Sequence, residues 1–134
     1  MKIFTSYFGN SRKLKEAGIK IICVAIGKPR FIAGIPQMLN VCPTRYMVSG
    51  TCSHDEYLKL YDRILASQDA NQVVKQIEML SGGKDVALCC YEKPGDFCHR
   101  HILAKWITEN TGIEITEFGV VEKKEPNYEQ ASLF

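Results

Sequence analysis

Apolar and polar residues along this chain form short runs typical of buried strands and longer stretches with the periodicity of amphipathic helices. The short runs predict four strands, at residues 2–7, 20–26, 85–91 and 113–118. The run at 20–26 is apolar almost throughout, which is typical of a central strand covered on both faces. The run at 113–118 alternates between apolar and polar residues, which indicates a strand at the edge of the sheet.

Helical periodicity fills the intervals between these strands. A short helix is predicted at residues 12–17, and two longer helices begin at Ser53 and Asp69, each of which opens a capping-box pattern. A last helix follows the polar loop after the third strand, with Asp96 as its expected N-cap and Gly112 as its left-handed C-cap. Its apolar stripe consists of Ile102, Leu103, Trp106 and Ile107.

This order of elements predicts an α/β fold: a three-layer, Rossmann-like sandwich with a mostly parallel sheet of about four to five strands. We expect a single α/β domain over residues 1–120 and a charged C-terminal tail over 121–134. Residues 31–51 have no clear periodicity. They are interpreted either as a loop that covers a substrate or as an irregular connection packed by its own apolar residues.

Composition narrows the class of partner. The chain has 134 residues, with 17 basic and 15 acidic side chains and a net charge of +2. This near balance does not indicate nucleic acid, although it leaves nucleic acid open as a partner. No apolar run is long enough to span a membrane or to act as a signal peptide, so we expect a cytoplasmic protein whose cysteines are free thiols. The sequence does not indicate an oligomeric state.

Polar side chains cluster where the predicted strands end. Because the carboxyl ends of parallel strands share one edge of the sheet, these side chains are expected to meet in one pocket. They are Thr5, Ser6 and Tyr7 at the end of the first strand, Lys28 and Arg30 after the second, Cys90, Glu92 and Lys93 after the third, and Glu117 at the end of the fourth.

Four basic residues are candidates for binding a small anionic ligand, such as a phosphate or a carboxylate, beside a helix N-terminus. They are Lys28, Arg30, Lys93 and Arg100. The loop lacks the multiple glycines of a P-loop or a dinucleotide-binding motif. Alternatively, Arg100 is a surface charge or the ion-pair partner of Glu92.

The candidate catalytic residues are Cys90, Glu92, Cys98 and His99. One hypothesis is nucleophilic catalysis by a cysteine that His99 and the helix end activate. Glu92 is then the general acid or base, unless it only pairs with Arg100. No metal or other cofactor is expected, but zinc bound by the two cysteines and His99 stays open as an alternative, as does a purely structural histidine.

The segment Val-Ala-Leu-Cys-Cys-Tyr-Glu-Lys, followed by Pro-Gly-Asp-Phe and Cys-His-Arg, resembles the signature of the domain-of-unknown-function 488 family. Cys90, Glu92, Lys93 and residues 98–100 match that signature position by position. The resemblance implies a compact Rossmann-like domain and no assigned reaction. The family's commoner branch has Asp-Val-Arg after its second strand, where this chain has Cys-Val-Ala-Ile-Gly-Lys-Pro-Arg.

Taken together, these features favour an enzyme, a hydrolase or a transferase, that acts on a phosphorylated or nucleotide-like small molecule. A non-catalytic module that binds a nucleotide or nucleic acid is the alternative from another class. A small zinc-binding protein is a third.

Overall fold

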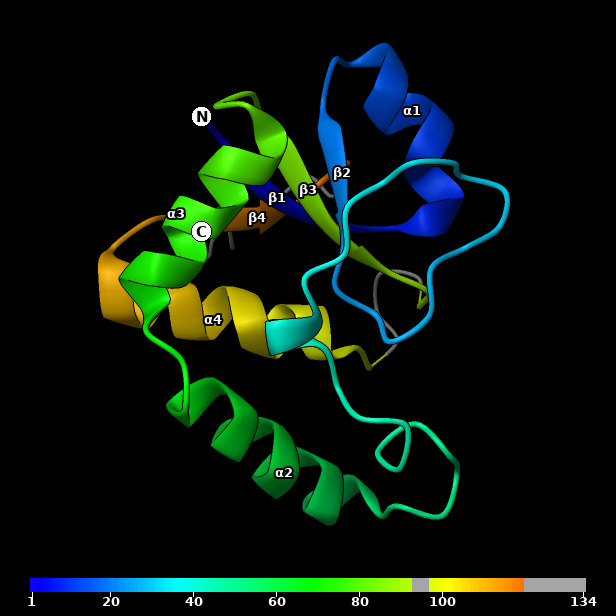
Figure 1. Ribbon diagram of the computed structural model, residues 1–134, viewed down its shortest axis with the longest axis vertical. Coiled ribbons are helices and arrows are strands. Elements are labelled where there is room, and N and C mark those ends of the chain that lie inside the picture. Colours follow the sequence, from blue (N-terminus) through cyan, green and yellow to red (C-terminus); the bar gives the residue numbers. More distant parts are fainter. Residues whose placement is uncertain (93–96, 120–134) are drawn as a thin grey trace, which may run out of the picture.

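The computed structural model (Figure 1) describes residues 1–92 and 97–119 and contains one parallel sheet of four strands. The predicted Rossmann-like α/β fold is therefore confirmed. The sheet has the order β2-β3-β1-β4, which places β3 and β1 in the centre and β2 and β4 at the two edges. The edge position predicted for the run at 113–118 is therefore confirmed, whereas the prediction that the run at 20–26 forms a central strand is wrong. The strands are β1 (Ile3–Tyr7), β2 (Lys20–Cys23), β3 (Val86–Cys90) and β4 (Ile115–Glu117).

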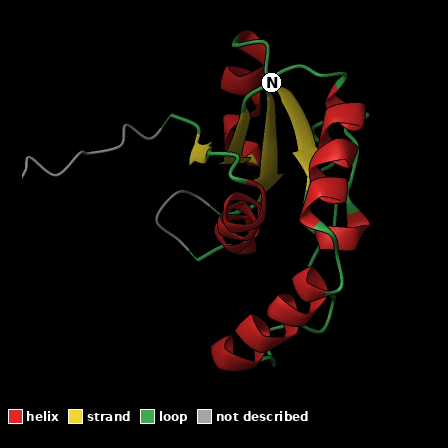
Figure 2. Ribbon diagram, turned by 90° about the vertical axis from the view of Figure 1, so that its left-hand side faces the viewer, coloured by secondary structure: helices red, strands yellow, loops and turns green. Residues whose placement is uncertain are grey.

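Helices cover both faces of this sheet. They are α1 (Ser11–Glu16), α2 (His54–Ala66), α3 (Ala70–Ser81) and α4 (His99–Thr111), with short 3-10 segments at Phe8–Asn10 and Leu39–Val41. One buried cluster joins α1 to one face of the sheet, and a larger cluster joins α2, α3 and α4 to the other. In Figures 1 and 2, α2 lies at the lower end of the molecule, farther from the sheet than α3 and α4.

Helix ends follow the predicted capping chemistry at three places. The Ser53 hydroxyl accepts a hydrogen bond from the backbone N–H of Glu56 at 3.1 Å, and the Asp69 carboxylate caps α3 in the same way. Gly112 ends α4 with φ 79°, a conformation that favours glycine. The prediction that Asp96 caps α4 is wrong, because the N-cap position belongs to Cys98.

The strand predicted at residues 20–26 is shorter in the structure and ends at Cys23. Beyond it, the amide of Gln37 donates hydrogen bonds to the carbonyl oxygens of Ala25 and Ile26, at 2.8 and 3.0 Å. The side chain of a loop residue thus forms the hydrogen bonds that these carbonyl groups would form with a neighbouring strand. The loop is also anchored by Met38 and Val41, which are fully buried in the core. The part of the loop from residue 36 to residue 42 is therefore a packed connection, as one of the two interpretations predicted.

Within the described residues, no helix combines the length and the apolar composition needed to cross a bilayer.

Candidate functional site

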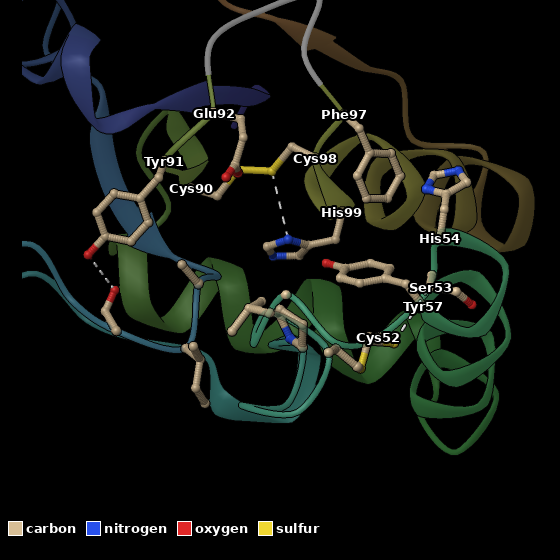
Figure 3. Close-up of a pocket in the computed structure, with 17 residues that line it drawn as sticks. Cys52, Ser53, His54, Tyr57, Cys90, Tyr91, Glu92, Phe97, Cys98 and His99 are labelled. Carbon is tan, nitrogen blue, oxygen red and sulfur yellow. Dashed lines mark hydrogen bonds between the residues drawn. A yellow bond between two sulfur atoms is a disulfide. The ribbon is translucent and has the colours of Figure 1, made fainter.

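A pocket of about 630 Å³ opens at the carboxyl ends of β2 and β3 (Figure 3). This is the edge at which open parallel sheets bind ligands, because the strands end there and loops replace them. Five segments contribute to it: the turn after β2, the second half of the 31–51 loop, the start of α2, the end of β3 and the start of α4. The cysteine, polar and aromatic side chains that line it are Cys52, Ser53, His54, Tyr57, Cys90, Tyr91, Glu92, Phe97, Cys98 and His99.

The floor of the pocket is a disulfide bond between Cys90 and Cys98. Cys90 ends β3 and Cys98 is the N-cap of α4, so the bond ties the strand to the helix across the intervening loop. The expectation that all cysteines are free thiols is wrong for this pair. It holds for the other four, Cys23, Cys42, Cys52 and Cys89.

His99 lies beside this disulfide, with both ring nitrogens in contact with the protein. Its Nε2 is 2.6 Å from the carbonyl oxygen of Val24, and its Nδ1 is 3.7 Å from Sγ of Cys98. A carbonyl oxygen only accepts, so Nε2 must carry the hydrogen. Burial lowers the pKa of His99 to about 4 despite the Val24 hydrogen bond. At neutral pH the imidazole is therefore uncharged, and the free lone pair of Nδ1 is directed at Cys98.

Arg100 is fully buried behind the disulfide, and all three of its guanidinium nitrogens donate hydrogen bonds. Nε and Nη2 bind the two carboxylate oxygens of Glu117, at 3.2 and 3.0 Å. Nη1 donates to Sγ of Cys90 at 2.9 Å and to the backbone oxygen of Glu92 at 2.7 Å. Arg100 thus holds the end of β3, the following turn and β4 in one fixed arrangement.

The carboxylate that pairs with Arg100 is Glu117, and not Glu92, which is one of the alternatives that the sequence leaves open for Arg100. Burial by itself would raise the pKa of Glu117, but hydrogen bonds from Arg100 and Thr5 outweigh this effect and lower the pKa below its ordinary value. Thr5 donates to the same carboxylate at 2.6 Å. The guanidinium group of Arg100 is therefore buried and paired with a carboxylate of the protein, whereas an anion-binding arginine would leave it available to a ligand.

Aromatic side chains form the two sides of the pocket. On one side, the ring of Phe97 packs edge-on against Tyr57, with 5.2 Å between ring centroids, and against His54 at 4.7 Å. On the other side, Tyr91 donates a hydrogen bond from its hydroxyl to the carbonyl oxygen of Gly27 at 2.8 Å. Figure 3 shows the disulfide and His99 between these two sides. Burial raises the pKa of Tyr57, so its hydroxyl stays protonated.

The structure brings together some of the expected site residues and separates others. All four candidate catalytic residues, Cys90, Glu92, Cys98 and His99, line the pocket. Of the other candidates that the structure describes, none lines it: Lys28 donates to the carbonyl oxygen of Ile35, Arg30 is exposed, Thr5 binds Glu117, Ser6 is buried, and Tyr7 is half-buried at the end of β1. Lys93 lies outside the described residues.

The aromatic sides were not among the expected site residues. Tyr57 belongs to the apolar stripe of α2, and Phe97 lies in a loop where no periodicity marks it. Phe97 is nevertheless 46% exposed, and a large exposed apolar ring beside reactive residues is a signal that sequence alone does not carry.

The fold and the pocket define a Rossmann-like α/β protein with a cysteine- and histidine-lined pocket at the carboxyl edge of its sheet. A family model described as "Active DUF488-N3 subclade" matches residues 38–111, which include most of the pocket. The chain belongs to the DUF488 family, as the signature around Cys90 and Cys98 indicated. No match was found among curated proteins, and none among solved structures.

Proposed function

We propose that this protein is an enzyme that acts on a small molecule with a planar, nucleobase-like ring. One observation carries the proposal: two aromatic sides enclose a floor made of two sulfur atoms and an imidazole, all in one pocket of about 630 Å³. That volume is within the range of small-molecule sites, and a nucleoside fits it.

The aromatic sides supply the affinity for the ring. An exposed aromatic face stacks on a nucleobase with a gain of about 1–3 kcal/mol, independent of the identity of the base. Phe97 and Tyr91 are each about half exposed, at 46% and 49%, so both have surface available for such contact. Binding of the ring would cover apolar surface that water now contacts.

The charges around the pocket favour the base or nucleoside part over a phosphate. Among the described residues that line it, none is a lysine or an arginine, and Glu92 is acidic. A phosphate group near Glu92 would meet like charge. We therefore propose that an uncharged ring binds between the aromatic sides, and that the ligand need not carry the anionic group expected from the sequence.

The chemistry would take place at the floor. Glu92 is exposed at the pocket and is the natural group to exchange protons with a bound substrate. Cys90 and Cys98 lie below it and are joined in a disulfide, so neither sulfur is a free thiolate in this form. The proposed reaction is therefore general acid or base catalysis by Glu92, with water or a second substrate as the nucleophile.

Binding is tested by calorimetric titration of the protein with adenosine, guanosine, cytidine and uridine, and with their 5′-monophosphates. We expect at least one nucleoside to bind, and Phe97→Leu to weaken binding by roughly 5- to 100-fold through loss of stacking. Phe31→Leu is the matched control, because Phe31 is 69% exposed but does not line the pocket. Unchanged affinity in Phe97→Leu, or no binding by any nucleoside, refutes the proposal.

Catalysis is tested with Glu92→Gln, since this exposed side chain can change without unfolding the protein. Product formation from the bound nucleosides, followed by chromatography, should fall by roughly 10²- to 10⁴-fold, the usual contribution of a general acid or base. Binding without any turnover by the wild-type protein would instead support the alternative, a non-catalytic module that binds nucleotides.

A further inference from the structure

We propose that, when the Cys90–Cys98 disulfide is reduced, Cys90, Cys98 and His99 bind a zinc ion at the floor of the pocket. Their three potential ligand atoms, Sγ, Sγ and Nδ1, lie within 4.8 Å of one another, and all three residues are buried. Two thiolates and one imidazole are ligands that zinc prefers. No other group of three such residues meets this distance within the described part of the chain.

The spacing between His99 and Cys98 already suits a metal. Zinc lies about 2.3 Å from sulfur and about 2.0–2.1 Å from nitrogen, so tetrahedral ligands are roughly 3.5–3.8 Å apart. The Nδ1 of His99 is 3.7 Å from Sγ of Cys98. Only the sulfur of Cys90 must move away from Cys98 once the bond between them is broken. The site is assembled from a strand end and a helix start, which explains why no zinc-knuckle spacing appears in the sequence.

The surrounding hydrogen bonds are those that support a metal ligand. A metal-bound histidine usually donates its second ring N–H to a carbonyl or a carboxylate, which fixes the tautomer. His99 does this through Nε2 and Val24, at 2.6 Å, and thereby leaves Nδ1 free on the sulfur side. Arg100 donates from Nη1 to Sγ of Cys90 at 2.9 Å, the kind of outer contact that stabilises a coordinated thiolate.

The fourth coordination position would face the pocket, because all three ligands line it together with Glu92. Three protein ligands and one open position are characteristic of catalytic zinc rather than structural zinc. A zinc ion bound in this way supplies a Lewis acid or an activated water. The inference does not depend on the proposed nucleoside, since the metal is measured without any organic ligand.

Loading requires two balanced steps. A dithiol reductant transfers two electrons and two protons to the disulfide, which gives two cysteine thiols and an oxidised reductant. Zinc then binds the two thiolates and neutral His99, and two protons are released to solvent. Disulfide and metal therefore exclude each other, and oxidation would eject the ion.

The experiment titrates the full-length protein, reduced and then freed of reductant, with Zn²⁺ against a chromogenic chelator. Co²⁺ is used as a spectroscopic probe of thiolate coordination. We expect one equivalent per chain, a cobalt-thiolate charge-transfer band, and no binding by the oxidised protein. Cys98→Ser should weaken binding by about 100-fold or more, while Cys52→Ser should leave it unchanged, because Cys52 lines the same pocket outside the cluster.

A second measurement keeps the test valid if Cys98→Ser does not fold. In the reduced wild-type protein, Zn²⁺ should protect Cys90 and Cys98 from alkylation, as mapped by peptide mass, while Cys52 reacts equally with and without the metal. The proposal is overturned if the reduced protein binds less than about a tenth of an equivalent. It is also overturned if Cys98→Ser retains wild-type affinity, or if Zn²⁺ leaves the alkylation pattern unchanged.

Discussion

The buried pair between Arg100 and Glu117 leads to the sharpest prediction for stability. Arg100 has no exposed side-chain surface and Glu117 only 12%, so neither charge is well hydrated. Two charge-assisted hydrogen bonds join them, each with a net contribution of about 1.5–3 kcal/mol. The substitution Glu117→Gln keeps the shape, but it removes the charge and can leave only one oxygen to accept from Arg100.

We therefore expect Glu117→Gln to lower the free energy of unfolding by about 3–5 kcal/mol, the range for leaving one member of a buried ion pair uncompensated. Arg100→Met should cost less, about 1–3 kcal/mol. Methionine fills most of the volume, and the carboxylate of Glu117 still accepts a hydrogen bond from Thr5 and still contacts solvent. The double substitution should cost less than the sum of the two single substitutions.

The assay is reversible denaturation in urea of the two single variants, the double variant and the wild-type protein. Glu109→Gln is the matched control: it removes an acidic charge from an exposed pair with Lys105, whose side chains are 62% and 76% exposed. It should change stability by less than about 0.5 kcal/mol. The prediction is wrong if Glu117→Gln lowers the free energy of unfolding by less than about 1 kcal/mol. It is also wrong if the effects of the two single substitutions simply add in the double variant.

Two further predictions follow from the same contacts. Because hydrogen bonds from Arg100 and Thr5 outweigh burial and depress the pKa of Glu117 below its ordinary value of 4.5, its contribution to stability should be complete above that pH. This stabilisation by Glu117 should then be lost as the pH falls through the lower pKa that the carboxylate has in the folded protein. If the free energy of unfolding depends on pH in the same way in wild-type protein and in Glu117→Gln below pH 4.5, the prediction is contradicted. Asp69→Ala removes two N-cap hydrogen bonds, of 2.9 and 3.2 Å, and should lower the free energy of unfolding by about 1 kcal/mol, as measured by urea denaturation. An unchanged free energy of unfolding would show that these two hydrogen bonds do not stabilise the protein.

Much of the fold could be predicted from the sequence because local patterns determine it. The apolar run at Val86–Cys90 becomes one of the two central strands, and all five of its residues are buried. Ser53 and Asp69 begin helices since their side chains satisfy backbone N–H groups within one turn. The location of the catalytic candidates at the ends of parallel strands follows from topology, and the four of them do share a pocket.

The partners of the charged and reactive groups depended on packing. Arg100 pairs with Glu117, which is 17 residues away on another element, and no spacing rule distinguishes Glu117 from the much nearer Glu92. The joining of Cys90 to Cys98 likewise depends on how the loop returns the helix to the end of the strand.

Sequence by itself therefore determined the elements, three of the four predicted helix caps and the edge of the sheet at which the candidate catalytic residues gather. Tertiary structure alone decided which charges are neutralised, which sulfurs meet and which rings enclose the pocket. The physical reason is range: helix and strand periodicity act over a few neighbouring residues. Hydrogen bonds such as that from His99 to Val24, across 75 positions, exist only after the whole chain has packed.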